Sequence, residues 1–141
     1  MGTRFLASEQ AGTNEGFRRR LVEANDGGQV TVRTRLFDDL RGLGDPERGG
    51  WTMAYDGRGL INRSVRDGAN GVQIEENIKT FKEALKKPEE GYGEEGRLIA
   101  YAGTGVGLID GVKSAAEIVE DVRRRMGEML NGLNLTRQEK L

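Results

Sequence analysis

The chain of 141 residues contains no cysteine and no histidine. Without cysteine it can form no disulfide, thiolate metal site or thiol nucleophile. Without histidine it lacks the commonest metal ligand and the commonest acid–base group near neutral pH. Its carboxylates are scattered, and none stands at a spacing that singles it out for acid–base catalysis or metal binding. We therefore predict no catalytic residue and no metal site in this chain.

Apolar residues are also scarce, because 35% of the chain is hydrophobic, 32% is charged and 22 residues are glycine. This composition predicts a loop-rich protein with a thin core. No window approaches the ~20 apolar residues of a membrane span, and the opening residues lack the pattern of a signal peptide. The net charge of −1 creates no field that would attract nucleic acid or an anionic membrane. We expect a soluble cytoplasmic protein that binds neither.

Three segments have the three- and four-residue apolar spacing of amphipathic helices. They are Glu15–Asn25, Ile74–Lys86 and Ala115–Leu130. Ser114, followed three residues later by glutamate, forms a capping box before the last of them. The pair at 131–132, Asn-Gly, is expected to end that helix, and the polar tail from residue 136 is expected to fray.

Strand signals are weaker. Val30–Phe37 alternates and is rich in β-branched residues, which predicts a strand with one solvated face. Leu98–Ala102 is a short apolar run typical of a buried strand, and Thr3–Ala7 suits the end of a strand. The turn residues of Asn25–Gly28 suggest a helix stop. Asp38–Gly71 contains turn chemistry throughout and predicts a long irregular loop, either functional or held by contacts elsewhere.

Three alternating glycines follow the Leu98–Ala102 run. They are Gly103, Gly105 and Gly107, within the segment Tyr101–Ile109. Glycine lets the backbone approach a ligand closely, but the spacing matches neither the dinucleotide fingerprint nor a P-loop. The residues alone leave two interpretations open, a tight structural loop or a ligand-facing loop, and they favour the first slightly.

Two further segments carry weak binding signals. Gly2 and Thr3 could present backbone N–H groups and a hydroxyl to a phosphate, or could simply form a chain end. Tyr55–Gly59 combines tyrosine, aspartate and arginine, which could bind a polar ligand. Its Asp-Gly turn chemistry favours the rim of a turn instead.

Several blocks, taken together, resemble nitronate monooxygenase, formerly called 2-nitropropane dioxygenase. They occur in the family's order and cover nearly the whole chain. The opening block and the glycine-rich block are the most specific of them. The blocks are Met1–Ala7, Gly28–Phe37, Tyr55–Asn62, Gly91–Arg97, Tyr101–Ile109 and the helix that follows Ser114.

The resemblance implies an α/β fold, namely a C-terminal fragment of a TIM-type (β/α)8 barrel with part of an inserted smaller α+β domain. Residues 1–27 would hold the last barrel strand and its helix. Residues 28–96 would hold the inserted strand, the long loop and a helix. Residues 97–135 would hold the closing strand, the glycine-rich loop and the C-terminal helix, followed by a frayed tail at 136–141.

The family uses FMN to oxidise alkyl nitronates or nitroalkanes with O2, which implies site residues here. Tyr101 would face the substrate. The residues that would bind the cofactor are Gly2, Thr3, Gly103, Thr104 and Gly105.

The chain departs from the family in two respects. A complete TIM barrel needs ~250 residues, and the family's catalytic histidine has no counterpart in a chain without histidine. We therefore expect weak or no FMN binding and no activity by this chain alone. The alternative hypothesis is a non-catalytic truncated relic, or a docking module without flavin chemistry. Either case favours self-association or a partner chain.

Overall fold

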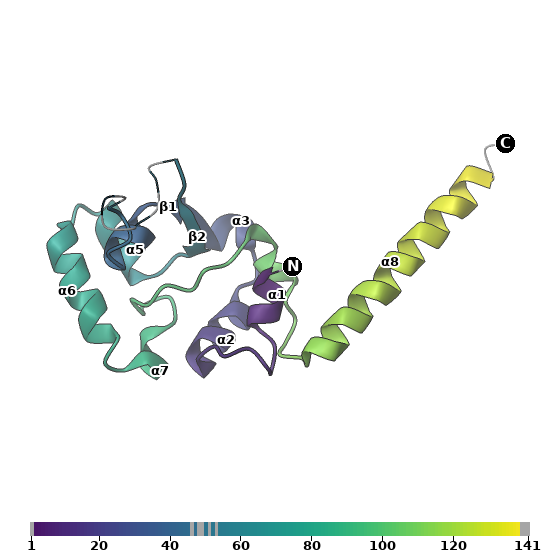
Figure 1. The fold of residues 1–141 in the computed structure, drawn as a ribbon, viewed down its shortest axis with the longest axis horizontal. Helices are drawn as coiled ribbons and strands as arrows, with labels where there is room; N and C mark the ends of the chain where they lie inside the picture. The colour runs from purple at the N-terminus through teal and green to yellow at the C-terminus, as the bar shows by residue number, and fades with distance from the viewer. Residues whose placement is uncertain (1, 46, 48–49, 51, 53, 139–141) are drawn as a thin grey trace.

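The computed structural model describes residues 2–45, 47, 50, 52 and 54–138 (Figure 1). Short helices surround a small antiparallel sheet, and one long helix extends away from them. In chain order the elements are α1 (Gly2–Leu6), α2 (Glu15–Glu23), α3 (Gly27–Val30), β1 (Thr31–Thr34), α4 (Leu36–Leu40), β2 (Gly57–Leu60), α5 (Arg63–Ala69), α6 (Ile74–Ala84), α7 (Pro88–Gly91), the 3-10 helix η2 (Thr104–Leu108) and α8 (Ala115–Gln138). Within these residues no helix is both long enough and apolar enough to cross a membrane.

The sheet is built around β2. Strands β1 and β2 pair antiparallel along their full lengths. The extended segment 98–102 lies along the other edge of β2. There the Leu60 N–H donates to the Ala100 carbonyl at 2.9 Å. The Ala102 N–H donates to the Arg58 carbonyl at 3.1 Å, so this segment continues the sheet although only one of its residues forms a bridge.

Buried apolar side chains form two clusters, and the segment 98–102 contributes to both. The first cluster gathers around α2 and comprises Ala7, Phe17, Leu21, Ala24, Leu60, Ala100, Ala102, Val106 and Ile109. The second lies between α4 and α6 and comprises Phe37, Leu40, Phe81, Leu98 and Ile99. The central segment therefore joins the two halves of the core.

The helices predicted from apolar periodicity are confirmed. The expected Glu15–Asn25 corresponds to α2, Ile74–Lys86 to α6, and the helix after Ser114 to α8. The capping box also forms. The Ser114 N–H donates to Glu117 Oε2 at 2.8 Å, and the Glu117 N–H donates to Ser114 Oγ at 3.2 Å.

The strand end expected at Thr3–Ala7 is wrong, because Gly2–Leu6 forms the short helix α1. Side-chain hydrogen bonds satisfy the carbonyls at its end. Ser8 Oγ donates to the Phe5 carbonyl at 2.8 Å, and Thr13 Oγ1 donates to the Leu6 carbonyl at 3.0 Å. Extended pairing begins only at Ser8, which forms a parallel bridge with Lys113.

The strand expected over Val30–Phe37 is shortened by helices at both ends. The expected helix stop at Asn25–Gly28 begins α3 instead, because Asp26 Oδ1 accepts the N–H groups of Gly28 and Gln29 at 3.0 and 3.3 Å. Aspartate is a strong N-cap residue, and here that role prevails over the turn signal. At the other end α4 begins at Leu36, so β1 keeps only four residues.

The loop expected over Asp38–Gly71 contains regular structure that its glycines concealed. It includes the end of α4, strand β2 and helix α5. Asn62 caps α5, since its Oδ1 accepts the Val65 N–H at 3.1 Å. At Gly59, a Cβ would lie 2.9 Å from the Ala100 carbonyl oxygen. Tight packing therefore explains a glycine within β2.

Two further expectations need correction. Leu98–Ala102 is buried apart from Tyr101, as predicted, but it forms no regular strand. Helix α8 does not stop at residues 131–132 and runs to Gln138. Gly132 has no positive φ, so it does not make the left-handed turn that ends a helix. The first three residues of the tail at 136–141 therefore belong to α8, and residues 139–141 lie outside the described part. The division into barrel and inserted segments stays a prediction.

Candidate functional site

The glycine-rich loop lies directly against the start of the chain. The Gly103 N–H donates to Thr3 Oγ1 at 3.0 Å, although the two residues are 100 positions apart. Gly103 is also the N-cap residue of η2. The Val106 N–H donates to the Gly103 carbonyl at 3.1 Å and forms the first turn of that helix. Two segments expected to bind the cofactor are thus in contact.

These segments border a cavity of about 420 Å³, which we call the Thr3 cavity. Helix α1, η2, the segment that follows it and the first turns of α8 form its walls. The lining residues are Thr3, Arg4, Gly103, Thr104, Gly105, Leu108, Ile109, Asp110, Lys113, Ile118, Asp121, Val122 and Arg125. Four of the five expected cofactor-binding residues are among them. Gly2 is not, and a Cβ on Gly2 would meet no atom within 4 Å.

Two glycines fix the position of η2 against the body of the protein. A Cβ on Gly27 would overlap the backbone of Thr104. Similarly, a Cβ on Gly107 would lie 2.7 Å from the Asn25 carbonyl oxygen. Since real side chains do not tolerate such approaches, glycine is needed on both sides of this contact. Gly103 and Gly105, by contrast, leave room for a Cβ, which would lie at ordinary contact distances of 3.6 Å from Thr3 Oγ1 and 4.0 Å from Leu108 Cδ1.

The Thr3 cavity carries charges of both signs. Arg4 donates through Nη1 to the Gly111 carbonyl at 2.7 Å, while its buried Nη2 has no hydrogen-bond partner. Lys113 lies 2.9 Å from Asp121 and 3.7 Å from Asp110. The hydrogen bond from Lys113 holds the pKa of the Asp121 carboxyl below its usual value. Arg4 is therefore a lining cation that has a buried donor without a partner.

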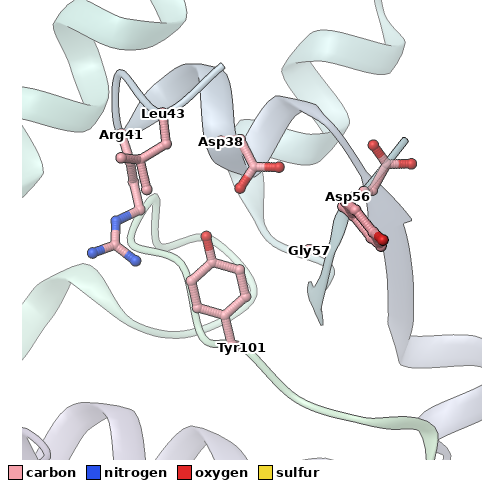
Figure 2. Close-up of a pocket in the computed structure, with 7 residues that line it drawn as sticks. Asp38, Arg41, Leu43, Asp56, Gly57 and Tyr101 are labelled. Carbon is pink, nitrogen blue, oxygen red and sulfur yellow. The ribbon is translucent and has the colours of Figure 1, made fainter. Parts of the chain in front are cut away.

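Tyr101 lies outside the Thr3 cavity and borders a second cavity of about 490 Å³ (Figure 2). We call it the Asp38 cavity, and its lining residues are Asp38, Arg41, Leu43, Tyr55, Asp56, Gly57 and Tyr101. The Tyr101 ring meets Phe37 edge-on at 5.9 Å between centroids, and the Arg41 guanidinium lies 5.7 Å from the ring centroid. The expected substrate-facing residue is thus separated from the expected cofactor-binding residues that line the Thr3 cavity.

Sequence reasoning missed several residues at these cavities. Arg4 lies in the opening block Met1–Ala7 but was not singled out there, and Lys113 belongs to no block. Only their positions beside Thr3 and Ser114 could have drawn attention to them. Asp38, which lines the second cavity, gave no signal beyond its place after an alternating segment. Tyr55–Gly59 was weighed as a ligand site and judged a turn rim, and its first three residues line the Asp38 cavity.

Three carboxyls, of which Asp121 lines the Thr3 cavity, are poor proton donors at neutral pH. The pKa values of three carboxyls lie below their usual values: Asp67 through hydrogen bonds from Arg97 and Arg63, Glu117 through Ser114, and Asp121 through Lys113. These three are ionised at neutral pH and cannot donate a proton there. Within the described part of the chain, no group of three or more acidic residues could hold a metal ion.

Two curated relatives match nearly the whole chain. It is 41% identical over 133 residues to nitronate monooxygenase npaC of Metarhizium robertsii. The match covers 94% of this chain and 36% of the relative. It is 37% identical over 130 residues to nitronate monooxygenase of Neurospora crassa, which covers 92% of this chain and 32% of the relative. The chain thus spans about a third of the length of these relatives, their C-terminal third. No family model matches it.

Two solved structures match the fold of this chain. The structure of FabK from Thermotoga maritima matches with a TM-score of 0.61 and 26% identity, over 95% of this chain and 38% of that one. Its M276A mutant matches with a TM-score of 0.59 and 25% identity. These neighbours are TIM-barrel enzymes, so the expected fold class, part of a TIM-type barrel, is confirmed.

Proposed function

We propose that this chain, which is similar to nitronate monooxygenases over the segment that it spans, forms the phosphate-holding part of an FMN site. The intact family is flavin-dependent. FMN, when bound, would take electrons from a nitronate and pass them to O2, while the protein supplies position and electrostatics. What this chain contributes is one end of the cofactor site and no catalytic base.

The contact between Thr3 and Gly103 carries this proposal. Thr3 Oγ1 accepts the Gly103 N–H, so the hydroxyl proton of Thr3 is left to donate to a phosphate oxygen. Gly103 and Gly105 have no side chains that would fill the space beside the Thr3 hydroxyl. The unsatisfied Nη2 of Arg4 provides positive charge at the same cavity. These features fit a phosphate group.

The rest of the cofactor finds less support. The Thr3 cavity is open on the side of Leu108, which is 86% exposed. Tyr101, the expected substrate-facing residue, borders the other cavity. We therefore infer weak FMN binding through the phosphate. We also infer no nitronate oxidation by this chain, since it contains no histidine to act beside the flavin.

The alternative function, a non-catalytic docking module, is favoured by one observation on α8. Six apolar side chains form its exposed apolar face, and each is at least 37% exposed. They are Val119, Val122, Met126, Met129, Leu130 and Leu133. A partner surface that covered this face would give the chain a role without flavin chemistry.

The test compares FMN with riboflavin, which differs only by the phosphate. Flavin fluorescence titrations on the full chain should show weak FMN binding and at least about tenfold weaker riboflavin binding, since a hydrogen bond to a charged group is worth about 1.5–3 kcal/mol. Thr3→Ala should remove the preference for FMN and Thr3→Ser should retain it. Thr80→Ala is the matched control, because Thr80 lies on α6 and bonds only within that helix.

Four results would count against the proposal. Equal affinity for FMN and riboflavin, or an unchanged preference in Thr3→Ala, would remove the phosphate site. Failure of FMN to bind at millimolar concentration would favour the docking module. Oxygen consumption with FMN and an alkyl nitronate, above that of FMN alone, would show that the chain does not need a histidine.

A further inference from the structure

The Asp38 cavity contains a buried carboxylate without a partner. Asp38 is 2% exposed, and its Oδ2 has no hydrogen bond. The backbone holds it in place, because its N–H donates to the Arg35 carbonyl at 2.9 Å and its carbonyl accepts the Leu43 N–H at 2.8 Å. Burying an unpaired carboxylate is costly. A hydrogen-bond donor that entered the cavity would remove this cost.

The surroundings of Asp38 define what that donor can be. In Figure 2, Asp38 and Asp56 lie to one side of the Tyr101 ring, and the Arg41 guanidinium lies to the other. Asp56 has an exposed ion pair with Arg33 at 3.8 Å. The charge of Arg41 is directed over the face of Tyr101 at 5.7 Å. The side of the cavity next to Asp38 is therefore negatively charged.

An aromatic and an aliphatic wall complete the cavity. The Tyr101 ring is held edge-on by Phe37. It also lies close to β2, where a Cβ on Gly57 would approach its Cε1 to 2.6 Å. Glycine at position 57 thus lets the ring pack against the strand. Leu43 adds an aliphatic surface, so the cavity combines one unsatisfied acceptor with apolar walls, the usual composition of a small-molecule site.

We propose that the Asp38 cavity binds a small molecule with a protonated amine, whose ammonium group donates to Asp38 Oδ2 while its apolar part packs against Tyr101 and Leu43. An anion is disfavoured, because it would face Asp38 without a donor to offer. The ligand proposed for the Asp38 cavity is therefore a cation, unlike a nitronate, which is an anion. The inference concerns only this cavity and does not depend on FMN binding at the Thr3 cavity.

The first test uses three probes of nearly equal size on the full wild-type chain: benzylamine, which is protonated at pH 7, benzyl alcohol and benzoate. Binding is followed by shifts of backbone amide signals in NMR titrations. Benzylamine should bind at least about tenfold more tightly than the alcohol and should shift residues around Asp38. Equal affinity of amine and alcohol would overturn the proposal, because Asp38 would then need no cationic donor. Tighter binding of benzoate would overturn it as well.

The second test changes the carboxylate. Asp38→Asn keeps the shape of the side chain and removes its charge, and should weaken benzylamine binding at least about tenfold. Asp39→Asn is the matched control, since Asp39 lies on the same helix but does not line this cavity. It should leave the affinity within about twofold. Unchanged binding in Asp38→Asn would overturn the proposal, whereas Thr3→Ala should affect FMN alone and so keeps the two sites distinguishable.

Discussion

Two adjacent residues at the start of α8 should respond very differently to truncation. Ile118 is 2% exposed and Val119 is 46% exposed. The first turns of α8 are attached to the body: the Ala115 N–H donates to Gln10 Oε1 at 2.8 Å, and Lys113 pairs with Asp121 at 2.9 Å. Further along, the helix leaves the body (Figure 1). Ile118→Ala therefore tests the buried contact between α8 and the rest of the protein. Val119→Ala tests the exposed apolar face of α8.

The expected magnitudes follow from burial. Replacing a buried isoleucine with alanine costs about 2–5 kcal/mol. Ile118 also borders the open Thr3 cavity, where neighbouring groups and water can fill the space, so we expect the lower half of that range. At Val119 two carbons are lost at about 0.8 kcal/mol per buried CH2, and only about half of that burial exists. The better helix propensity of alanine offsets about 0.5 kcal/mol, which leaves a change close to zero.

The assay is urea unfolding at 25 °C, monitored by far-UV circular dichroism. The dependence of the free energy of unfolding on urea concentration is compared between variants, so that a change in stability can be told from a change in exposed surface. Ile118→Ala should lower the free energy of unfolding by about 2–3 kcal/mol, and Val119→Ala by less than about 0.5 kcal/mol. Both substitutions gain similar helix propensity, so the difference between them reports burial. Equal losses would refute the reasoning, since α8 would then pack through a face that is exposed in this structure.

Three further predictions concern the loop, the pH response and the long helix. Gly27→Ala should cost about 1–3 kcal/mol, because its Cβ would overlap Thr104, whereas Gly28→Ala, whose Cβ meets only an Asp26 oxygen at 3.3 Å, should cost nothing in the same assay. Arg97 lowers the pKa of Asp67, so Asp67 stabilises the fold above its unfolded pKa of about 3.9. The deficit of Asp67→Asn should be present at pH 7 and shrink as the pH falls below about 4, and a constant deficit would contradict the pairing. The exposed apolar face of α8 should make light scattering during thermal unfolding rise with concentration. A monomer with a concentration-independent transition above about 60 °C would contradict this.

Apolar periodicity predicted the fold best where a helix has one buried face over several turns. Helix α6 shows this, since Ile74, Ile78 and Phe81 all pack in the second core cluster. Periodicity failed where structure depends on distant partners. Strand β2 contains two glycines and no alternation, and it exists because β1 and the segment 98–102 pair with its two edges. Such pairing is invisible in a local window.

The sequence also failed to predict the short helices α3 and α5. Each of them begins because a single side chain caps its first turn. Asp26 starts α3 and Asn62 starts α5 through hydrogen bonds to backbone N–H groups. The same residue types also occur in turns, so the sequence leaves helix start and turn equally open. Gly132 shows the converse, because a glycine that usually ends a helix lies inside α8. The backbone conformation at that position, not the residue type, decides the outcome.

For the candidate site, the resemblance placed Thr3 and Gly103 together although no local pattern links them, and their hydrogen bond agrees with that placement. It also predicted that Tyr101 faces the substrate beside them, whereas Tyr101 borders the Asp38 cavity. Ala102 is 4% exposed in the first core cluster, so a buried residue separates Tyr101 from the glycines that follow. The side chain of Tyr101 consequently borders one cavity and the backbone of residues 103–105 the other. Since the two linings share no residue, a substitution in either cavity can be read without disturbing its neighbour. Phosphate preference and amine preference are therefore independent measurements on one chain.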